Sequence, residues 1–333
     1  MMRAVASDSA AARPQVSVII PTWNGRELLE VCLCSLRQQT FRDFEIIVVD
    51  NGSADDTIPW LAAEHESVRV VAFGENRGFA AAANGGIRAA RGSTIVLLNN
   101  DTEAHPGWLA ALVRAVEEHP EAGFFASRVL NFYERSLVDS AGDMLGPLAY
   151  QIGHGQPDGP PFDSPRSVLS ACAAAAAYRR DMLDDIGLFD ESFVSYLEDV
   201  DLGLRAQYAG YSCLYVPDAV VYHMVSATAR RIADTKLRLL LRNSLLLFFQ
   251  YMPPRTVALW GAVMLGWPFV YVIRRRHPVR IAAQALTGFV RHAPAAMRRR
   301  RDVRSRGAIT DTDLRRLLSP PFGTAAPVGG RAS

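Results

Sequence analysis

The sequence predicts an α/β fold in which helices flank a mostly parallel β-sheet. Short β-branched runs alternate with longer helical patterns over the first third of the chain, and polar residues follow several of these runs. Strands that alternate with helices form βαβ units with right-handed crossovers, and such units build parallel sheets. Ligands bind beyond the carboxyl ends of these strands, which is where the polar clusters of this sequence fall.

Hydrophobic periodicity defines the elements of this region. The β-branched run 16–20 predicts a buried strand, and leucines on one stripe of 25–39 predict an amphipathic helix. Ser53 with Asp56 predicts a capped helix start, and Pro106 predicts the first turn of a later helix. The expected elements in chain order are strand 16–20, helix 25–39, strand 45–50, helix 53–61, strand 68–73, helix 78–91, strand 94–98 and helix 106–119.

The pattern becomes less regular past Gly123. Residues 142–167 are rich in Gly and Pro, which predicts a long irregular loop. A helical segment is expected over 181–186, and a helix that follows the acidic stretch 198–201 is expected to run through Leu204 and Tyr208 to Gly210. A last strand is expected over 213–216, ended by Pro217, with His223 just beyond it.

Composition and missing motifs exclude several classes of protein. The 333 residues allow two domains, or one large domain with an extension. Hydrophobic residues make up 49% and charged residues 21%, which excludes a disordered or collagen-like chain. PTWNG stands where a dinucleotide-binding fold needs GxGxxG, and no Walker motif is present. The cysteines form no CxxC pair, so neither a zinc ribbon nor a disulfide framework is expected.

Five segments carry a resemblance to a known family. VSVIIPTWNG, EIIVVDNGSADDT, ENRGFAAAAN, IVLLNNDTE and GLFDESFVSYLEDVDL follow one another within residues 16–228. This ordered set resembles the family 2 glycosyltransferases of the GT-A fold, and most of all the bacterial rhamnosyltransferases. The resemblance implies a GT-A domain over 16–228 and an inverting enzyme that takes its sugar from a nucleoside-diphosphate donor.

The resemblance also implies a nucleotide-sugar site at the strand ends. Asp50 can accept hydrogen bonds from a pyrimidine base or a ribose, and the alternative is an Asx-turn with Asn51 and Gly52. Small residues near Asn76 let the backbone approach a ligand closely, although helix propensity also explains the alanines. The implied nucleotide-sugar residues are Pro21, Thr22, Asn24, Asp50, Asn76, Gly78, Ala80, Asn99, Asn100 and Asp101.

Asn99-Asn100-Asp101 takes the place of the family's DXD motif. A donor diphosphate is neutralised by a hard cation, Mg²⁺ or Mn²⁺, which carboxylate oxygens hold well. Only Asp101 is ionised in this version of the motif. The resemblance implies that His223 is a second metal ligand; the alternative is a structural histidine.

Glu198 and Asp199 resemble the acidic motif on the family's acceptor side. Inverting transfer needs a carboxylate to take the proton of the attacking acceptor hydroxyl. Asp199 is the expected base, Glu198 is expected to support it or to orient the acceptor, and Asp201 is expected to cap the following helix. The alternative is that all three acids are only helix-start charges. The QxxRW motif of processive synthases is missing, which favours transfer of a single sugar.

The C-terminal part differs sharply in charge from the rest. Between Arg230 and Arg306 there are 17 basic and two acidic residues, a net of +15, while the whole chain carries +2. Residues 229–306 are therefore expected to form a basic helical extension with its own partner. The uncharged stretch 257–273, interrupted by Pro268, favours a helix in the membrane interface over a transmembrane span.

Arg298–Arg301 are expected to attract anionic lipid. Nucleic acid is disfavoured as a partner by the interleaved Leu, Trp and Phe, and an interface in a homo-oligomer is the simpler alternative. Residues 1–15 and 307–333 are expected to be disordered tails. The polar N-terminus lacks an apolar segment, so no secretory signal is expected, and the enzyme is predicted at the cytoplasmic face of the cell membrane.

Together these features predict a glycosyltransferase of cell-envelope polysaccharide synthesis. The resemblance favours dTDP-rhamnose as the donor and a lipid-linked sugar or growing glycan as the acceptor, although UDP-sugars fit the same loops. The alternative is a catalytically silent sugar-nucleotide-binding or scaffold protein at the membrane. The single carboxylate of Asn99-Asn100-Asp101 supports that alternative, and the intact Glu198-Asp199 pair counts against it.

Overall fold

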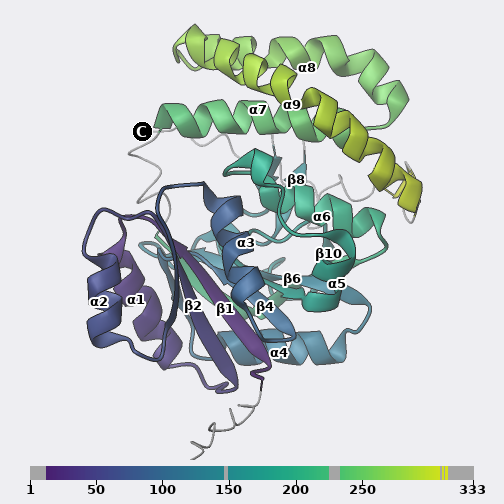
Figure 1. Cartoon of the computed structure of the whole chain (residues 1–333). Coiled ribbons are helices and arrows are strands. Elements are labelled where there is room, and N and C mark those ends of the chain that lie inside the picture. The colour runs from purple at the N-terminus through teal and green to yellow at the C-terminus, as the bar shows by residue number, and fades with distance from the viewer. Residues whose placement is uncertain (1–12, 146–148, 225–232, 308–309, 311, 314–333) are drawn as a thin grey trace, which may run out of the picture.

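The computed structural model describes residues 13–145, 149–224 and 233–307, together with 310, 312 and 313. Its main sheet has the strand order β10-β12-β6-β11-β4-β1-β2-β3, with β5 paired to β12 and β7 paired to β6. Helices cover both faces of this sheet, and three C-terminal helices form a further layer on one side (Figure 1). The prediction of an α/β fold with flanking helices and C-terminal helices is confirmed.

The strands are β1 (Val16–Thr22), β2 (Phe44–Asn51), β3 (Arg69–Phe73), β4 (Thr94–Leu98), β5 (Thr102–Ala104), β6 (Ala122–Asn131), β7 (Val138–Ser140), β8 (Asp143–Leu145), β9 (Ala149–Gln151), β10 (Arg166–Val168), β11 (Ala175–Arg179) and β12 (Ser212–His223). The helices are α1 (Arg26–Arg37), α2 (Thr57–Glu64), α3 (Phe79–Ala89), α4 (Trp108–Glu118), α5 (Arg180–Ile186), α6 (Glu198–Tyr208), α7 (Ala233–Tyr251), α8 (Pro254–Arg274) and α9 (Val279–Arg306), with one 3₁₀ turn, η1 (Glu191–Phe193).

The N-terminal half of the sheet is parallel, as the alternation of strands and helices predicts. β1 lies between β2 and β4, and β3 pairs with β2, all in the same direction. Alternate residues of β1 serve the two faces: Val16, Val18 and Ile20 pack with α1 and α4, whereas Ile19 packs on the side of α3. This two-residue period is that of a strand buried on both faces.

The second half of the sheet was predicted less well. β6 was not expected as a strand, and β11 forms from the alanine run, antiparallel to both β4 and β6. Alanine has little strand preference of its own, so its neighbours in the sheet decide its conformation. The segment 142–167 is not one irregular loop, because β8, β9 and the start of β10 lie in it.

Three local predictions were wrong. β12 continues through Pro217 to His223, because a register shift against β6 between Val216 and Val220 accommodates the proline. Ser53 does not cap α2: its Oγ accepts a hydrogen bond from the backbone N–H of Asn24 instead. Pro268 lies inside α8 without ending it.

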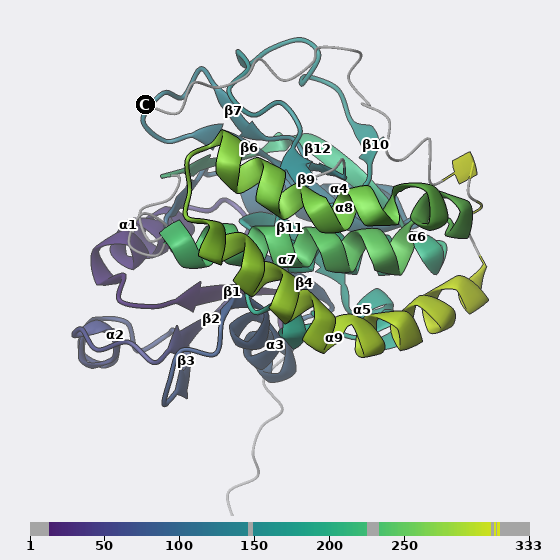
Figure 2. The same cartoon turned by 90° about the horizontal axis from the view of Figure 1, so that it is seen from above.

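The C-terminal helices pack on the α/β part and on one another. Buried side chains of α6, α7, α8 and α9 share one apolar cluster, which includes Val200, Leu204, Leu245 and Phe289. Seen from above, α8 and α9 lie on either side of α7 (Figure 2). The predicted tails lie mostly outside the described residues, which begin at Arg13 and have little beyond Gly307.

Candidate active site

A cavity of about 790 Å³ opens where the carboxyl ends of β1 and β4 meet the start of α6. The N-terminal part of α7 forms another wall, with Lys236 and Leu239 among its lining residues. The predicted site residues that line the cavity are Pro21, Thr22, Asn76, Gly78, Asn99, Asn100, Asp101, Glu198, Asp199 and His223. Residues from five distant stretches of the sequence therefore meet at one place.

Three predicted residues, Asn24, Asp50 and Ala80, are not among the lining residues. The Oδ1 of Asn24 accepts a hydrogen bond from the Ala54 N–H at 2.7 Å, which ties two loops together. Asp50 is fully buried, and its Oδ2 accepts a hydrogen bond from Ser53 N–H, as in the turn-forming alternative. The other oxygen of Asp50, Oδ1, is buried without a hydrogen-bond partner among the described residues. Ala80 is buried as well.

His223 lies between two carboxylates at the end of β12. Its Nε2 is 3.2 Å from Oδ1 of Asp101, and its Nδ1 is 2.7 Å from Oδ2 of Asp139. His154 contacts the other oxygen of Asp139 at 3.1 Å. Burial lowers the pKa of His223, but the hydrogen bonds and charges of the two aspartates outweigh it and raise that pKa to about 10. Burial raises the pKa of Asp139, yet the two histidines lower it overall, to about 2.

This arrangement fits a divalent cation. Because Asp139 holds one ring nitrogen of His223, the other nitrogen faces the carboxylate of Asp101 with a fixed orientation. Carboxylate oxygen is the ligand that Mg²⁺ and Mn²⁺ prefer, and a cation between these two groups would replace the shared proton. Asn100, which precedes Asp101, donates a hydrogen bond from its side-chain amide to Thr22 Oγ1 at 2.9 Å. This bond ties the loop 99–101 to the end of β1.

In the acidic pair at the start of α6, Glu198 is buried and Asp199 is half-buried. Both oxygens of Asp199 accept backbone hydrogen bonds, from Ala173 N–H at 3.1 Å and from Val200 N–H at 2.9 Å. Burial raises the pKa of Asp199, and these hydrogen bonds oppose it only in part. Burial and the charge of Asp199 raise the pKa of Glu198 well above its ordinary value, and Oε2 of Glu198 is buried without a partner among the described residues.

Asp143 and Cys172 lie beside this pair. The Sγ of Cys172 and one carboxylate oxygen each of Asp143 and Asp199 lie within 4.8 Å of one another. Burial, and then the charge of Asp199, raise the pKa of Asp143 well above its ordinary value. The pKa values of the carboxyl groups on this side of the cavity are therefore raised, and a carboxylate with a raised pKa is a stronger proton acceptor when it is ionised.

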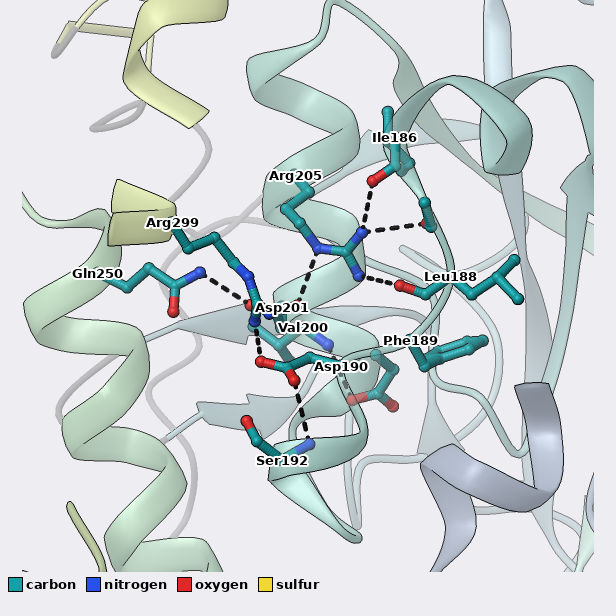
Figure 3. Close-up of polar contacts among 12 residues, drawn as sticks. Ile186, Leu188, Phe189, Asp190, Ser192, Val200, Asp201, Arg205, Gln250 and Arg299 are labelled. Carbon is teal, nitrogen blue, oxygen red and sulfur yellow. Dashed lines mark hydrogen bonds and ion pairs between the residues drawn. The ribbon is translucent and has the colours of Figure 1, made fainter. Parts of the chain in front are cut away.

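Asp201 does not cap α6, which corrects the prediction. Its Oδ2 accepts a hydrogen bond from Nε of Arg205 at 2.9 Å, and its Oδ1 accepts one from the Tyr251 hydroxyl at 2.7 Å. Arg205 also donates to the carbonyls of Ile186 and Leu188 (Figure 3). Asp201 therefore joins α6 to α7 and to the loop before η1.

The segment 193–197, which precedes the acidic pair, has an unfavourable backbone. Val194 has φ 66° and ψ −68°, and the Ser195 N–H donates to the Phe193 carbonyl at 2.8 Å, which is the rare, sterically unfavourable form of γ-turn. Tyr196 and Leu197 also have positive φ, at 69° and 67°. Each such residue costs about 1–3 kcal/mol, so other parts of the fold must hold the segment in place.

Two side chains of α7 supply that support. Asn243 is fully buried, and its Nδ2 donates to the carbonyls of Phe193, Ser195 and Tyr196 at 3.1, 3.1 and 2.6 Å. Arg242 donates from Nη2 to the Phe193 carbonyl at 2.7 Å, and from Nε to Oδ1 of Asn243 at 2.8 Å.

The same segment reaches the predicted donor side. The Val194 carbonyl accepts from the Ala80 N–H at 3.1 Å, and Ser195 Oγ accepts from the Phe79 N–H at 3.0 Å. A Cβ on Gly78, which has φ +87°, would lie 2.4 Å from the Val194 carbonyl oxygen. The segment 193–197 therefore links α7, the acidic pair and the start of α3.

Part of the basic C-terminal cluster also serves packing. Arg299 forms an ion pair with Asp190, the residue that caps η1 (Figure 3). Arg300 donates to the carbonyls of Phe249 and Gln250 at 2.9 and 3.1 Å. Of the four arginines expected to face lipid, only Arg298 and Arg301 are exposed.

Sequence reasoning missed several residues of this site. Asp139 lies on the three-residue strand β7, and no motif in the sequence marks it. Lys236 had a clearer signal, because it is the only lysine in the chain. Asn243 gave none, because a polar residue on an amphipathic helix reads as part of its exposed face. Residues 225–232, which join β12 to α7, lie outside the described residues.

Comparison with known proteins gives one consistent family. The family model described as "Glycosyl transferase family 2" matches residues 17–187. An N-acetylglucosaminyl-diphospho-decaprenol L-rhamnosyltransferase from Mycobacterium tuberculosis is 29% identical over 240 residues, covering 64% of this chain and 77% of that protein. The chain spans only 25% of the length of another relative, at 30% identity, from Sinorhizobium fredii.

Solved structures show the same fold. The structure of GalNAc-T7 with UDP, GalNAc and Mn²⁺ aligns with a TM-score of 0.58 at 16% identity, covering 73% of this chain and 49% of that one. A mannosyltransferase from Pyrobaculum calidifontis in complex with GDP-Man and Mn²⁺ aligns with a TM-score of 0.51 at 20% identity, covering 92% and 83%. At these identities the likeness concerns the GT-A fold.

Proposed function

The chain belongs to glycosyl transferase family 2, and on that premise we propose that it moves one sugar, with inversion, from a nucleoside-diphosphate donor to a lipid-linked acceptor. The observation that carries the proposal is one cavity in which Asp101 and His223 lie together with the acidic pair Glu198-Asp199. Asp101 and His223 can hold a cation that neutralises a diphosphate, and the acidic pair can accept a proton. Inverting sugar transfer needs both.

On the donor side, Asp101 and His223 would hold Mg²⁺ or Mn²⁺. When bound, such a cation neutralises charge on the donor diphosphate. Asp139 fixes the ring of His223, and Thr22 fixes the side chain of Asn100, so the chain's own contribution is to orient these groups before the donor arrives. The solved relatives named above contain Mn²⁺ with a nucleotide or nucleotide sugar, which supports this cation class.

On the acceptor side, Asp199 would act as the base. The acceptor oxygen forms a bond to the anomeric carbon, the bond from that carbon to the diphosphate oxygen breaks, and the hydroxyl proton passes to the Asp199 carboxylate. The raised pKa of this half-buried carboxyl brings it closer to neutral pH, where a base accepts protons most effectively. Glu198 would orient the acceptor or support the base.

We favour dTDP-rhamnose as the donor and a polyprenyl-diphosphate sugar as the acceptor. The name of the Mycobacterium tuberculosis relative specifies transfer of L-rhamnose onto a decaprenyl-diphosphate sugar, which supports both choices. No motif of a processive synthase follows the acidic pair, and this supports the transfer of a single sugar.

The extension 229–306 would place the enzyme on the cytoplasmic face of the cell membrane. α8 has the length and mean hydropathy, 1.7, of a membrane-spanning helix, although it is the only such helix among the described residues. One of its faces packs inward through Met264, Pro268 and Val272. Its outward face exposes apolar side chains, namely Leu259, Trp260, Val263, Val270 and Ile273.

An interfacial position fits this arrangement better than a span. α8 lies alongside α7 and also contacts α9, with one face already packed, so it would have to leave these partners to cross a bilayer. Lying flat, it would bury only its outward face in lipid, with Arg255 and the arginines after Ile273 near the anionic headgroups. A second copy of the chain on the same face is the alternative partner.

A donor panel tests the proposal. Full-length protein with Mn²⁺ is given dTDP-rhamnose, UDP-sugars and GDP-sugars together with a polyprenyl-diphosphate N-acetylglucosamine acceptor, and release of the nucleoside diphosphate is measured. Acceptor-dependent release with one donor, lost in Asp199→Asn, is the expected result. Donor binding without release for any acceptor would instead favour a silent sugar-nucleotide-binding protein.

A further inference from the structure

Lys236 is the only lysine of the 333-residue chain, and it lines the cavity from the second turn of α7. The charged and ionisable groups that line the cavity with it are mostly acidic, namely Asp101, Asp139, Asp143, Glu198 and Asp199, with His154 and His223. No arginine is among the described lining residues. Among the described lining residues, Lys236 is therefore the one lysine or arginine side chain.

The ammonium of Lys236 has no carboxylate partner within ion-pair distance among the described residues. Its Nζ lies instead over the ring of Tyr196, 5.4 Å from the ring centroid. Burial lowers the pKa of Lys236, and the charge of Asp139 opposes this without reversing it. A half-buried cation without a counterion is costly, and a bound anion would relieve that cost.

The position of Lys236 indicates which anion it can reach. Tyr196, whose ring holds the ammonium, lines the same cavity as Asp101 and Glu198. Burial first, and then the charges of Glu198 and Asp101, raise the pKa of Tyr196 to about 12. Lys236 in turn feels the charge of Asp139, which orients His223. The ammonium thus lies in the same cavity as the proposed metal ligands and the proposed base.

We infer that Lys236 binds diphosphate oxygens in this cavity, with Tyr196 holding its ammonium in place. The inference rests on the proposed function, which brings two diphosphates to the site: the leaving group of the donor and the group that links the acceptor to its lipid. Charge grows on the leaving diphosphate as its bond to the sugar breaks, and an ammonium already in position would stabilise that charge. An acceptor diphosphate would be held by the same contact during binding.

The test uses the full-length protein with Mn²⁺ and the variants Lys236→Gln and Lys236→Arg. Arg238→Gln is the matched control, because it removes one positive charge from the same helix at a residue that does not line the cavity. Binding of dTDP, UDP, dTMP and UMP is measured by calorimetry. Turnover is measured with a polyprenyl-diphosphate sugar and with an octyl glycoside of the same sugar, which has no diphosphate. The midpoint of thermal unfolding confirms that each variant folds.

If the donor diphosphate is the partner, Lys236→Gln weakens binding of the nucleoside diphosphate about 10- to 100-fold and of the monophosphate much less. If the acceptor diphosphate is the partner, nucleotide binding is unchanged, and KM rises for the polyprenyl-diphosphate sugar but not for the octyl glycoside. Lys236→Arg should restore part of either effect, because it keeps the charge.

The inference is overturned if Lys236→Gln matches Arg238→Gln in nucleotide binding and in both acceptor assays. Failure of the proposed function looks different, because the wild-type protein itself would then release no nucleoside diphosphate with any donor and acceptor, whether or not it binds one. The wild-type turnover assay therefore separates the two failures.

Discussion

Replacing Asn243 with leucine should remove the support of the segment 193–197 while keeping a buried side chain of similar size. The two amide hydrogens of Asn243 serve the carbonyls of Phe193, Ser195 and Tyr196, and leucine can donate to none of them. The Phe193 carbonyl keeps its hydrogen bond from Arg242, so the carbonyls of Ser195 and Tyr196 are the two groups that lose their donor. An unsatisfied buried polar group costs about 1–3 kcal/mol, so these two groups amount to about 2–6 kcal/mol if the segment keeps its shape.

The segment would not keep its shape, and this sets the expected magnitude. Val194, Tyr196 and Leu197 each relieve about 1–3 kcal/mol of backbone strain when they leave positive φ. The free energy of unfolding should therefore fall by only about 2 kcal/mol, with the remainder recovered by local rearrangement. Glu198 and Asp199 follow this segment directly, so they should move with it. A displacement of about 1 Å can cost on the order of 100-fold in rate.

The assay combines urea unfolding with steady-state kinetics at saturating donor. Ser244→Ala is the matched control: Ser244 is the next residue of α7, and its hydroxyl is buried without a hydrogen-bond partner among the described residues. Losing that hydroxyl should change stability by less than about 1 kcal/mol and leave kcat unchanged. The reasoning is refuted if Asn243→Leu behaves like Ser244→Ala in both measurements.

Four further outcomes are expected. Asp199→Asn should keep the fold and donor binding but lower turnover about 10²- to 10⁴-fold; near-normal turnover would remove Asp199 as the base. EDTA should weaken binding of the nucleoside diphosphate, measured by calorimetry, because a cation held by Asp101 and His223 would neutralise the charge of the diphosphate. Equal affinity with and without EDTA would contradict a role of these two residues as cation ligands. Gly78→Ala should destabilise the protein to urea, because its Cβ would meet the Val194 carbonyl at 2.4 Å and a φ of +87° is strained; an unchanged midpoint would count against the close contact. Trp260→Ser should reduce sedimentation with anionic vesicles, and salt should release the wild-type protein partly; full resistance to salt and to alkaline carbonate would favour a transmembrane span.

The N-terminal half of the fold was predictable because its signals are local. β-branched runs bounded by Pro, Gly and Asn define β1, β2 and β4, and strand 94–98 was predicted with the bounds that the structure shows. The site followed from a topological rule, since polar residues at the carboxyl ends of parallel strands must converge. Thr22, Asn100 and Asp101 meet in the cavity for that reason.

The rest depended on contacts that leave no local pattern. The alanines of β11 become a strand because β4 and β6 flank them, and the proline in β12 is tolerated because of a register shift. Asp139 reaches His223 across 84 residues of sequence. Its place in the site follows from the pairing of β7 with β6, and no sequence period encodes that pairing.

The structure of the basic extension 229–306 differs most from what the sequence predicted. Its charge and apolar residues suggested a membrane attachment separate from the catalytic domain, but α7 has two roles inside the site. Its first turns supply Lys236 and Leu239 to the cavity wall, and Asn243 holds the segment before the acidic pair. Near the end of α7, the carbonyl of Tyr251 accepts a hydrogen bond from the Tyr208 hydroxyl. The hydroxyl of Tyr251 donates a hydrogen bond to Asp201.

This arrangement has a consequence for an acceptor that stays in a membrane. α8 and α9 pack directly on α7, so any surface that binds the outward face of α8 is one helix away from the cavity. A lipid-linked sugar could then reach Asp199 while its lipid remains in the bilayer, because the cavity wall and the proposed membrane face belong to adjacent helices. Interfacial binding would also favour the packed position of α7, and with it the conformation of the segment 193–197. Vesicles should therefore raise kcat on a water-soluble acceptor in the wild-type protein, and this increase should be smaller in Asn243→Leu, where α7 no longer holds that segment.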